Sequence, residues 1–308
     1  MHKSSRVYVA GHTGFVGGAL TERLRNLGFK NLILRTHSQV DLKGQAVVER
    51  LFKEERPEYV FLLAAKVGGI YANNTYPADF IYQNLAIQAN IIHAAYKYKA
   101  KKLLFPGSSC MYTKYCPQPM KEEHLLSGPI EPTSEPFAVA KIAGIRMCQA
   151  YNRQYKTDFT SVVPATVYGP KDHFDINGHV MASLIEKFCD NKDVSIWGTG
   201  KPKREFIFID DAVNALIFLM RNYNGSGIIN IGTGTEISVK ELVQKIKDVV
   251  SFKGRVTFDK SRPDGMPRRL LDSARLLKMG WRPKVGLEEG IRSTYEWYKA
   301  RGLRNREG

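Results

Sequence analysis

The segment from Val7 to Leu27 limits the possible fold more than any other stretch of the sequence. Val7–Ala10 is a short run rich in β-forming residues, and an amphipathic helical pattern covers Ala19–Leu27. Glycines in a Gly-x-x-Gly-x-x-Gly spacing separate them. A strand, a glycine turn and a helix in this order let the backbone approach a pyrophosphate, whose charge the helix N-terminus stabilises. We therefore predict a dinucleotide site lined by Gly11, His12, Thr13, Gly14, Phe15, Val16 and Gly17.

The rest of the first half repeats the alternation of strand and helix. Apolar runs predict strands over residues 32–34, 59–63, 103–105 and 159–163, and helical periodicity predicts helices over 45–55 and 80–98. Such alternation indicates an α/β fold with a doubly wound parallel sheet of the Rossmann type. Beyond residue 164 the pattern is less regular. We predict a nucleotide-binding Rossmann domain over residues 1–163, and a smaller, mostly substrate-binding domain over 164–308, with segments of about 205–235 returning to the first.

The end of the second expected strand indicates which nicotinamide cofactor fits. An acidic residue at this point would hold the ribose 2′-hydroxyl of NAD, whereas an arginine accommodates the 2′-phosphate of NADP. Arg35 follows the strand directly, and no carboxylate occurs before Asp41. The sequence therefore favours NADP(H), with a surface arginine as the alternative interpretation of Arg35.

A second candidate site lies between Phe105 and Lys141. The expected strand over 103–105 is followed by Ser108, Ser109 and Cys110, which places hydroxyls and a thiol at its carboxyl end, the edge where open α/β sheets bind ligands. Further on, Phe137 and Lys141 are four residues apart at a helix start, so their side chains share one helical face.

These residues resemble those of the extended short-chain dehydrogenase/reductase family, which places Ser, Tyr and Lys together with Tyr and Lys in a Tyr-x-x-x-Lys spacing. Phe137 stands where that family has its Tyr. Several local sequences narrow the resemblance to the group of GDP-L-fucose synthases over essentially the whole chain: Ala10–His12, Ala65–Ile70, Asn73–Pro77, Gly107–Cys110, Asn177–Val180, Trp197–Gly200, Arg204–Phe206 and Arg262–Gly265.

The resemblance implies NADPH-dependent conversion of GDP-4-keto-6-deoxy-D-mannose to GDP-L-fucose, by 3,5-epimerisation followed by reduction at C4. It implies that the catalytic residues are Ser108, Cys110, Phe137 at the Tyr position, Lys141 and His179. Beyond the glycine turn, the implied cofactor-binding residues are Arg35, Asp41, Leu42, Ala64, Lys141, Pro164, Ala165, Thr166, Val167 and His179. The implied substrate-binding residues are Ser108, Ser109, Lys187, Trp197, Arg204 and Asp264.

Phe137 changes what the resemblance implies. Phe keeps the ring of Tyr but has no proton to give to the alkoxide that ketone reduction leaves. We therefore expect binding and epimerisation to be retained and reduction to be slow. An engineered Tyr-to-Phe change is the favoured origin because the surrounding site residues are intact, and a natural chain with another proton donor is the second.

Two other functions stay open. One is a related GDP-sugar epimerase or 4-reductase of a heptose or colitose pathway, because Thr166 lies in Pro-Ala-Thr-Val where the familiar fucose synthases carry Pro-Thr-Asn. The other is a catalytically silent NADP-binding protein, which Phe137 favours and the presence of Cys110 and His179 opposes.

Charge and composition limit the partners. The formal net charge is +16, but the basic residues are scattered and form no nucleic-acid-reading motif, so phosphate-bearing small molecules are preferred as partners. The four cysteines lack metal-ligand spacing. No apolar run approaches a membrane span, and the N-terminus lacks a signal-peptide pattern, so we predict a cytoplasmic protein without membrane, nucleic-acid or metal partners. The family resemblance implies a homodimer formed through a helix bundle that includes residues 80–98.

Overall fold

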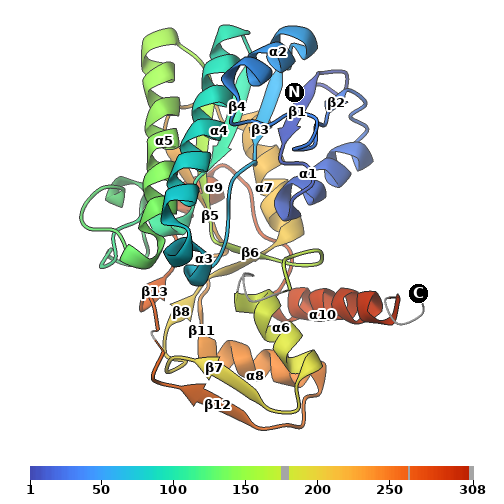
Figure 1. Cartoon of the computed structure of the whole chain (residues 1–308), viewed down its shortest axis with the longest axis vertical. Coiled ribbons are helices and arrows are strands. Elements are labelled where there is room, and N and C mark those ends of the chain that lie inside the picture. The colour runs from blue at the N-terminus through green and yellow to red at the C-terminus, as the bar shows by residue number, and fades with distance from the viewer. Residues whose placement is uncertain (175–179, 263, 305–308) are drawn as a thin grey trace.

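The computed structural model describes residues 1–174, 180–262 and 264–304. Its largest sheet has six parallel strands in the order β10-β5-β4-β3-β1-β2 (Figure 1). These strands are β1 (Val7–Ala10), β2 (Leu32–Ile33), β3 (Tyr59–Leu62), β4 (Lys102–Pro106), β5 (Phe159–Pro164) and β10 (Ile228–Ile231). The predicted doubly wound α/β fold is confirmed.

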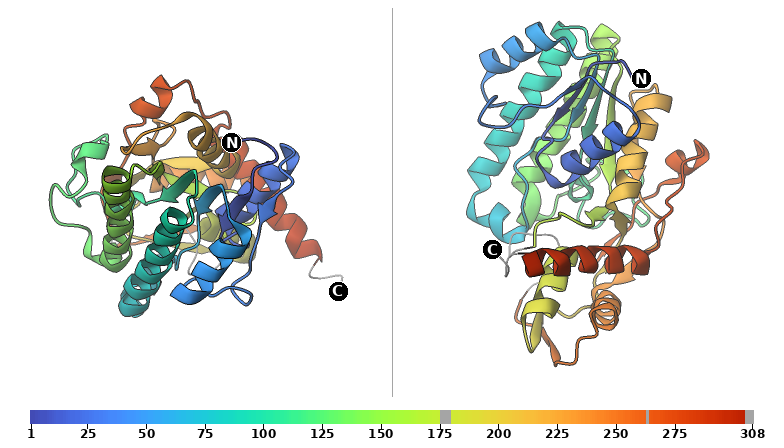
Figure 2. Two further views of the ribbon diagram at one scale, coloured as in Figure 1. Left: turned by 90° about the horizontal axis from the view of Figure 1, so that it is seen from above. Right: turned by 90° about the vertical axis from the view of Figure 1, so that its right-hand side faces the viewer.

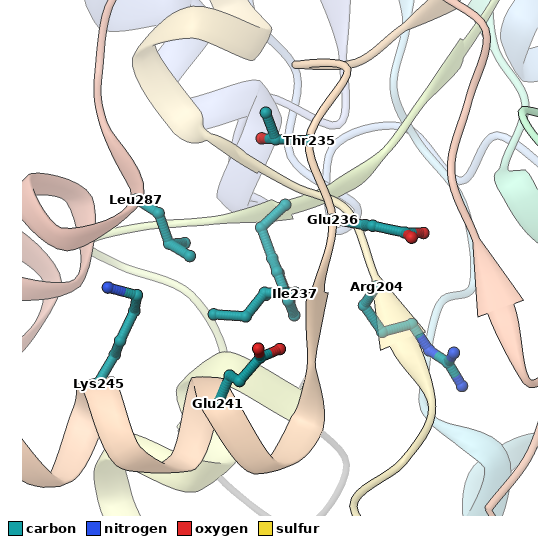
Figure 3. Close-up of a pocket in the computed structure, with 8 residues that line it drawn as sticks. Arg204, Thr235, Glu236, Ile237, Glu241, Lys245 and Leu287 are labelled. Carbon is teal, nitrogen blue, oxygen red and sulfur yellow. The ribbon is translucent and has the colours of Figure 1, made fainter.

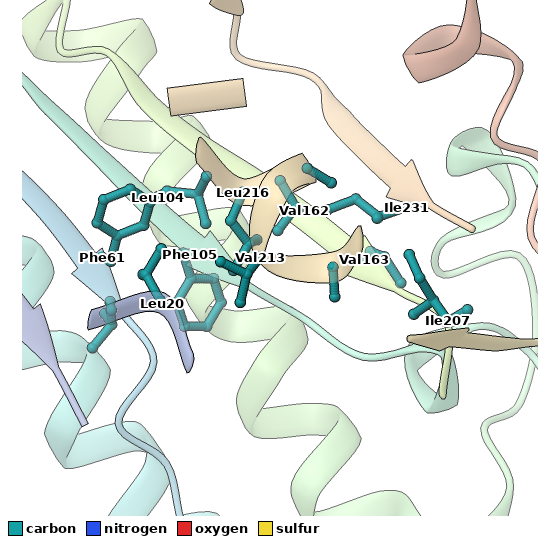
Figure 4. Packing of buried hydrophobic residues seen from close by; sticks show 14 of the residues in the cluster. Leu20, Phe61, Leu104, Phe105, Val162, Val163, Ile207, Val213, Leu216 and Ile231 are labelled. Atoms are coloured by element: carbon teal, nitrogen blue, oxygen red, sulfur yellow. The ribbon is translucent and has the colours of Figure 1, made fainter. Parts of the chain in front are cut away.

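Helices cover both faces of this sheet, as Figure 2 shows. One face carries α2 (Gln45–Glu55), α4 (Pro77–Lys97) and α5 (Glu135–Tyr155), and the other carries α1 (Phe15–Asn26) and α7 (Ile209–Asn222). All four residues of β1 and of β10 are buried, as expected of parallel strands that are covered on both faces. In Figure 4, Leu20 of α1 and Val213 and Leu216 of α7 pack beside strand residues such as Leu104 and Val162.

The chain crosses from the sheet into a second, smaller layer at the carboxyl ends of the strands (Figure 1). This layer contains three small sheets, β6–β9, β7–β12 and β11–β8–β13. Their strands are β6 (Thr166–Tyr168), β7 (Val194–Trp197), β8 (Lys203–Arg204), β9 (Phe206–Phe208), β11 (Ile237–Ser238), β12 (Val256–Asp259) and β13 (Arg268–Arg269). Its helices are α6 (Val180–Asp190), α8 (Val239–Val250) and α10 (Leu287–Arg304).

Several short elements lie in the connections between these strands and helices. They are α3 (Ile70–Thr75), α9 (Ala274–Lys278) and the 3₁₀ turns η1 (Ser109–Met111), η2 (Glu122–His124) and η3 (Pro132–Ser134). Helix α9 packs against β10, so residues after β13 also return to the large sheet. Strand β10 belongs to that sheet and helix α7 packs against it, whereas β9 pairs with β6 outside it. The expected division of the chain at residue 163 stays a prediction.

Side-chain oxygens fix several element ends in this part of the chain. Strands β8 and β9 flank the buried Glu205 and belong to different sheets, and the Glu205 carboxylate accepts hydrogen bonds from backbone N–H groups of other segments. Helix α7 includes Asp210 and Asp211, and the Asp211 carboxylate accepts hydrogen bonds from the backbone N–H groups of Lys284 and Val285. Ser238 caps α8, with a reciprocal bond to Glu241.

Candidate functional site

The glycine turn brings three backbone segments into close contact. Gly11 has a φ of +87°, and a Cβ atom there would lie 2.7 Å from the backbone nitrogen of Ala64. A Cβ atom on Gly17 would lie 2.0 Å from the carbonyl oxygen of Gly11. Only glycine fits at either position, and this close approach holds the N-terminus of α1 at the carboxyl end of β1.

The same turn fits a dinucleotide. Gly14 caps α1 without a side-chain hydrogen bond, and the first turn of α1 has no acidic residue, so the helix N-terminus is suited to an anion. Nδ1 of His12 is buried and has no hydrogen-bond partner among the described residues. Burial lowers the pKa of His12, which keeps its ring neutral at pH 7. An unpaired ring nitrogen beside an open helix end is an arrangement that a bound pyrophosphate and ribose would complete.

Arg35 lies where the sequence places it, just beyond β2, but it has a partner that the sequence did not indicate. Its guanidinium forms an ion pair with Glu55 at the end of α2 and also donates to the Leu34 carbonyl oxygen at 3.0 Å. The loop that follows is fixed by Asp41, whose carboxylate accepts from the Lys43 backbone at 3.0 Å, and this bond lowers the pKa of Asp41. A 2′-phosphate at Arg35 would therefore compete with the Glu55 carboxylate.

Ser108 and Cys110 meet at the carboxyl end of β4. The Cys110 thiol donates to the Ser108 hydroxyl with an Sγ–Oγ distance of 3.3 Å. The turn η1 begins at Ser109, and the Met111 N–H bonds to the Ser108 carbonyl oxygen at 3.0 Å, which fixes the two side chains relative to each other. Both Ser109 and Cys110 are buried.

Lys141 approaches the same strand end from α5. Its ammonium donates to the Pro106 carbonyl oxygen at 2.9 Å and lies 4.6 Å from the Phe105 ring centre and 5.8 Å from that of Phe137. Burial lowers the pKa of Lys141 to about 8, and the charge of Cys110 opposes this shift. The Phe137 ring packs edge-on against Phe80 at 6.4 Å. Four of the five expected catalytic residues thus lie around one strand end, and the fifth, His179, lies outside the described residues.

The expected substrate residues other than Ser108 and Ser109 lie in the second, smaller layer. Arg204 at the end of β8 has its pKa lowered to about 10 by burial and by the neighbouring Arg269, and Asp264 opposes that shift. Asp264 also accepts hydrogen bonds from the Thr199 backbone at 2.6 Å and hydroxyl at 2.7 Å, which ties its loop to β7. Trp197 is 49% exposed and is not part of the core. The Lys187 ammonium donates a hydrogen bond to the Ser195 carbonyl oxygen at 3.4 Å.

The segment over residues 164–167 carries the chain from β5 into β6. The Ala165 N–H bonds to the Ile231 carbonyl oxygen at 2.8 Å, and the Thr166 N–H bonds to the Glu205 carbonyl oxygen at 3.2 Å. These bonds fix Pro164, Ala165, Thr166 and Val167 at the same edge of the sheet as Ser108 and the glycine turn.

Sequence reasoning missed two residues. The buried Glu205 carboxylate accepts from the backbone N–H groups of Thr233 and Gly234, each at 2.7 Å, and of Leu271 at 2.9 Å. It therefore positions the neighbouring Arg204, and burial raises its own pKa. Arg269 lies opposite Arg204 on the adjacent strand. The doublet Arg268–Arg269 in an otherwise apolar context was the available signal.

Arg204 also borders a cavity of about 350 Å³ in the second, smaller layer. Its lining runs over β8, β11, the first turns of α8 and Leu287, as Figure 3 shows. The Arg204 guanidinium points away from Lys245 and Leu287 in that view. Of the described residues that line it, none belongs to the group around Cys110, so this cavity is separate from the acid–base residues.

A glycine turn suited to a dinucleotide, next to a Ser and a buried Lys at the carboxyl edge of a parallel sheet, defines the class of short-chain dehydrogenase/reductase folds. Residues 7–232 match the NAD dependent epimerase/dehydratase family, and the chain belongs to this family. Among its described residues, no helix is long and apolar enough to cross a membrane.

Relatives resemble the chain over nearly its whole length. GDP-L-fucose synthase 1 of Arabidopsis thaliana is 50% identical over 302 residues, which are 96% of this chain and 94% of that protein. GDP-L-fucose synthase of Escherichia coli is 48% identical over 308 residues, with 95% and 96% covered. A solved structure of a GDP-mannoheptose C4 reductase from Campylobacter jejuni with NADP bound is 41% identical, with a TM-score of 0.90 and 97% and 99% covered.

Proposed function

We propose that this protein is an NADPH-dependent epimerase and reductase that converts GDP-4-keto-6-deoxy-D-mannose to GDP-L-fucose, with a reduction step slowed by Phe137. The observation that carries the proposal is the meeting of Ser108, Cys110 and Lys141 at the end of β4, at the sheet edge that also holds the glycine turn. The names of the Arabidopsis and Escherichia coli relatives, and the NADP in the Campylobacter structure, support the same conclusion.

Epimerisation needs a base and an acid beside a ketone. The C4 carbonyl of the substrate acidifies the protons at C3 and C5, and Ser108 holds the carbonyl oxygen by a hydrogen bond. Cys110 as thiolate removes a proton, the C–H bond breaks, and its electron pair moves to the C4 oxygen. His179 returns a proton to the opposite face of the carbon. Thiol and imidazole can exchange protons near neutrality, which suits both groups to this step.

Reduction needs a hydride and then a proton. NADPH, when bound, supplies hydride to C4. The Lys141 ammonium holds the nicotinamide ribose and adds positive charge near the developing alkoxide, but Phe137 has no hydroxyl to protonate it. Loss of a general acid typically slows a step by about 10²–10⁴-fold. We therefore propose that epimerisation outruns reduction in this chain, whether Phe137 is engineered or natural.

The remaining assignments are those that the family resemblance implies. NADPH contacts the glycine turn, Arg35, the Asp41–Leu42 loop, Ala64 and residues 164–167. The GDP-sugar contacts Ser108, Ser109, Lys187, Trp197, Arg204 and Asp264, and a guanidinium suits its diphosphate because it can bond bidentately. The adjacent helices α4 and α5 expose Tyr82, Leu85, Val139 and Tyr155, which supports a homodimer through this pair. A cytoplasmic location stays a prediction.

A second candidate substrate is a GDP-4-keto-heptose. The 41% identity to the Campylobacter GDP-mannoheptose C4 reductase favours it, as does Thr166. A substrate panel separates the two: GDP-4-keto-6-deoxy-D-mannose and GDP-4-keto-heptoses are each incubated with NADPH, and products are identified by NMR. We expect GDP-L-fucose from the first with the higher kcat/KM. A higher kcat/KM on a GDP-4-keto-heptose would identify the heptose as the substrate. No turnover on any substrate would support a catalytically silent NADP-binding protein.

A further inference from the structure

Two arginines lie side by side on neighbouring strands beside the proposed substrate site. Strand β13 runs parallel to β8, with Arg269 opposite Arg204 and Arg268 opposite Lys203. Because successive side chains of a strand point to opposite faces, Arg204 and Arg269 share the inner face, and Lys203 and Arg268 share the outer face. The more buried residue of each strand is the inner one.

The outer pair has a counterion. Glu236 accepts a hydrogen bond from Nε of Arg268 at 2.7 Å and lies 3.6 Å from Nζ of Lys203. On the inner face, Arg204 donates to the Lys203 carbonyl oxygen at 2.8 Å, and Nε of Arg269 donates to the Met266 sulfur at 3.1 Å. Neither inner arginine forms a salt bridge with a carboxylate within the described part of the chain.

This inner face is therefore suited to an anion that the described residues do not supply. Like charges opposite each other on adjacent strands destabilise a sheet, and burial lowers the pKa of both guanidinium groups. Such an arrangement persists when a ligand or a reacting anion offsets the repulsion.

The two arginines face different charges. The charge of Asp264 raises the pKa of Arg204, whereas the charges of Cys110 and then Glu131 raise that of Arg269. Hydrogen bonds hold the Arg269 strand in this position: the Met120 N–H bonds to the Leu270 carbonyl oxygen at 2.7 Å, and the Leu270 N–H bonds to Gln118 Oε1 at 3.0 Å. Both partners belong to the loop that follows Cys110.

We propose that Arg269 is a further catalytic residue of the epimerisation step, which stabilises negative charge at the Cys110 end of the substrate site. This role rests on the proposed function. When the thiolate takes a proton from C3 or C5, an S–H bond forms and the electron pair of the C–H bond moves to the C4 oxygen. The negative charge passes from sulfur to oxygen, and a guanidinium at this end of the site can stabilise both because it has several N–H donors.

The test compares Arg269→Gln with Arg269→Lys, Arg204→Gln and the matched control Arg268→Gln. Exchange of the C3 and C5 protons of GDP-4-keto-6-deoxy-D-mannose is followed by NMR in deuterated buffer at saturating substrate. We expect Arg269→Gln to slow exchange about 100-fold, the loss typical of a removed charge-stabilising donor, and Arg269→Lys to recover at least about tenfold of it. Arg268→Gln should stay within about twofold.

Two further measurements separate this role from diphosphate binding. Calorimetry with GDP should give a Kd that rises about tenfold or more for Arg204→Gln and less than about threefold for Arg269→Gln. Iodoacetamide alkylation of the ligand-free protein, mapped by peptide mass spectrometry, should slow at Cys110 in Arg269→Gln and not at the exposed Cys189, because the thiolate is the reactive form.

A folded Arg269→Gln variant with unchanged exchange and unchanged Cys110 alkylation would overturn the proposal. So would a loss of GDP affinity equal to that of Arg204→Gln with undiminished exchange at saturation, which would assign Arg269 to the diphosphate. If the wild-type chain exchanges no protons, the proposed function fails instead, and the alkylation rates alone decide whether Arg269 acts on Cys110.

Discussion

Phe137 is the residue that separates this chain from a complete Ser-Tyr-Lys arrangement. Its ring packs against Phe80 and lies 5.8 Å from the Lys141 ammonium, so the surroundings accommodate an aromatic ring beside the proposed catalytic lysine. One oxygen atom distinguishes it from Tyr. The consequence is confined to chemistry, because the fold around the ring does not depend on a hydroxyl.

Phe137→Tyr should raise NADPH oxidation at saturating GDP-4-keto-6-deoxy-D-mannose by about 10²–10⁴-fold, since it restores a general acid. The unfolding temperature should stay the same, which serves as the control for structure. Absorbance at 340 nm measures the rate. Equal turnover by the two proteins would show that another group already donates the proton.

The Arg35–Glu55 pair makes a second prediction at the scale of single residues. Arg35→Ala should raise KM for NADPH about tenfold or more and leave KM for NADH nearly unchanged, because only NADPH has a 2′-phosphate. Glu55→Gln should lower KM for NADPH, because it frees the guanidinium. The exposed Arg50→Ala on the same helix is the control. An equal rise of KM for NADPH and for NADH in Arg35→Ala would show that Arg35 does not bind the 2′-phosphate.

At the scale of elements, short strands and their connections position the substrate residues. β8 has two residues, and its orientation depends on hydrogen bonds to β11 and β13 and on the Glu205 carboxylate. Sequence periodicity records local alternation only and does not separate β8 from β9. The partners of Glu205 lie 28 to 66 positions away in the chain, and no local pattern encodes them.

Glu205→Ala should lower the free energy of unfolding by about 3 kcal/mol, because three buried backbone N–H groups lose their acceptor. It should also raise KM for the GDP-sugar, because the hydrogen bonds of Glu205 hold β8 in place and Arg204 lies on β8 opposite Arg269. Urea denaturation measures the first effect. Glu288→Ala, on the exposed side of α10, should change stability by less than about 0.5 kcal/mol. A Glu205→Ala protein as stable as the wild type would contradict this account of β8.

At the scale of the whole molecule, the order of the strands and helices around the six-stranded sheet could be predicted, because each of these elements has its own local sequence pattern. Packing between distant segments could not, and this includes β10 beside β5, α9 on β10 and Arg269 beside Arg204. The glycine turn was recognised because backbone geometry demands glycine there, and the Ser108–Cys110 segment because its hydroxyls and thiol directly follow an expected strand. Arg269 belongs to no motif and is significant only through its neighbours in space.

The exposed apolar residues of α4 and α5 predict association of two whole molecules. Sedimentation equilibrium should give a mass about twice the 34.8 kDa of one chain. The double change Tyr82→Glu and Leu85→Glu should shift the protein toward monomers, whereas Tyr115→Glu, which lies outside α4 and is 76% exposed, should not. A monomeric wild-type protein at micromolar concentration would rule out this dimer.

Proton exchange tests the central claim most directly. GDP-4-keto-6-deoxy-D-mannose is incubated in deuterated buffer with NADP⁺ and without a hydride source, and the C3 and C5 signals are followed by NMR. Deuterium should enter both positions with the wild-type chain and with Phe137→Tyr, and should not enter with Cys110→Ser. Exchange that is absent in the wild type, or that continues undiminished in Cys110→Ser, would contradict the assignment of Cys110 as the base.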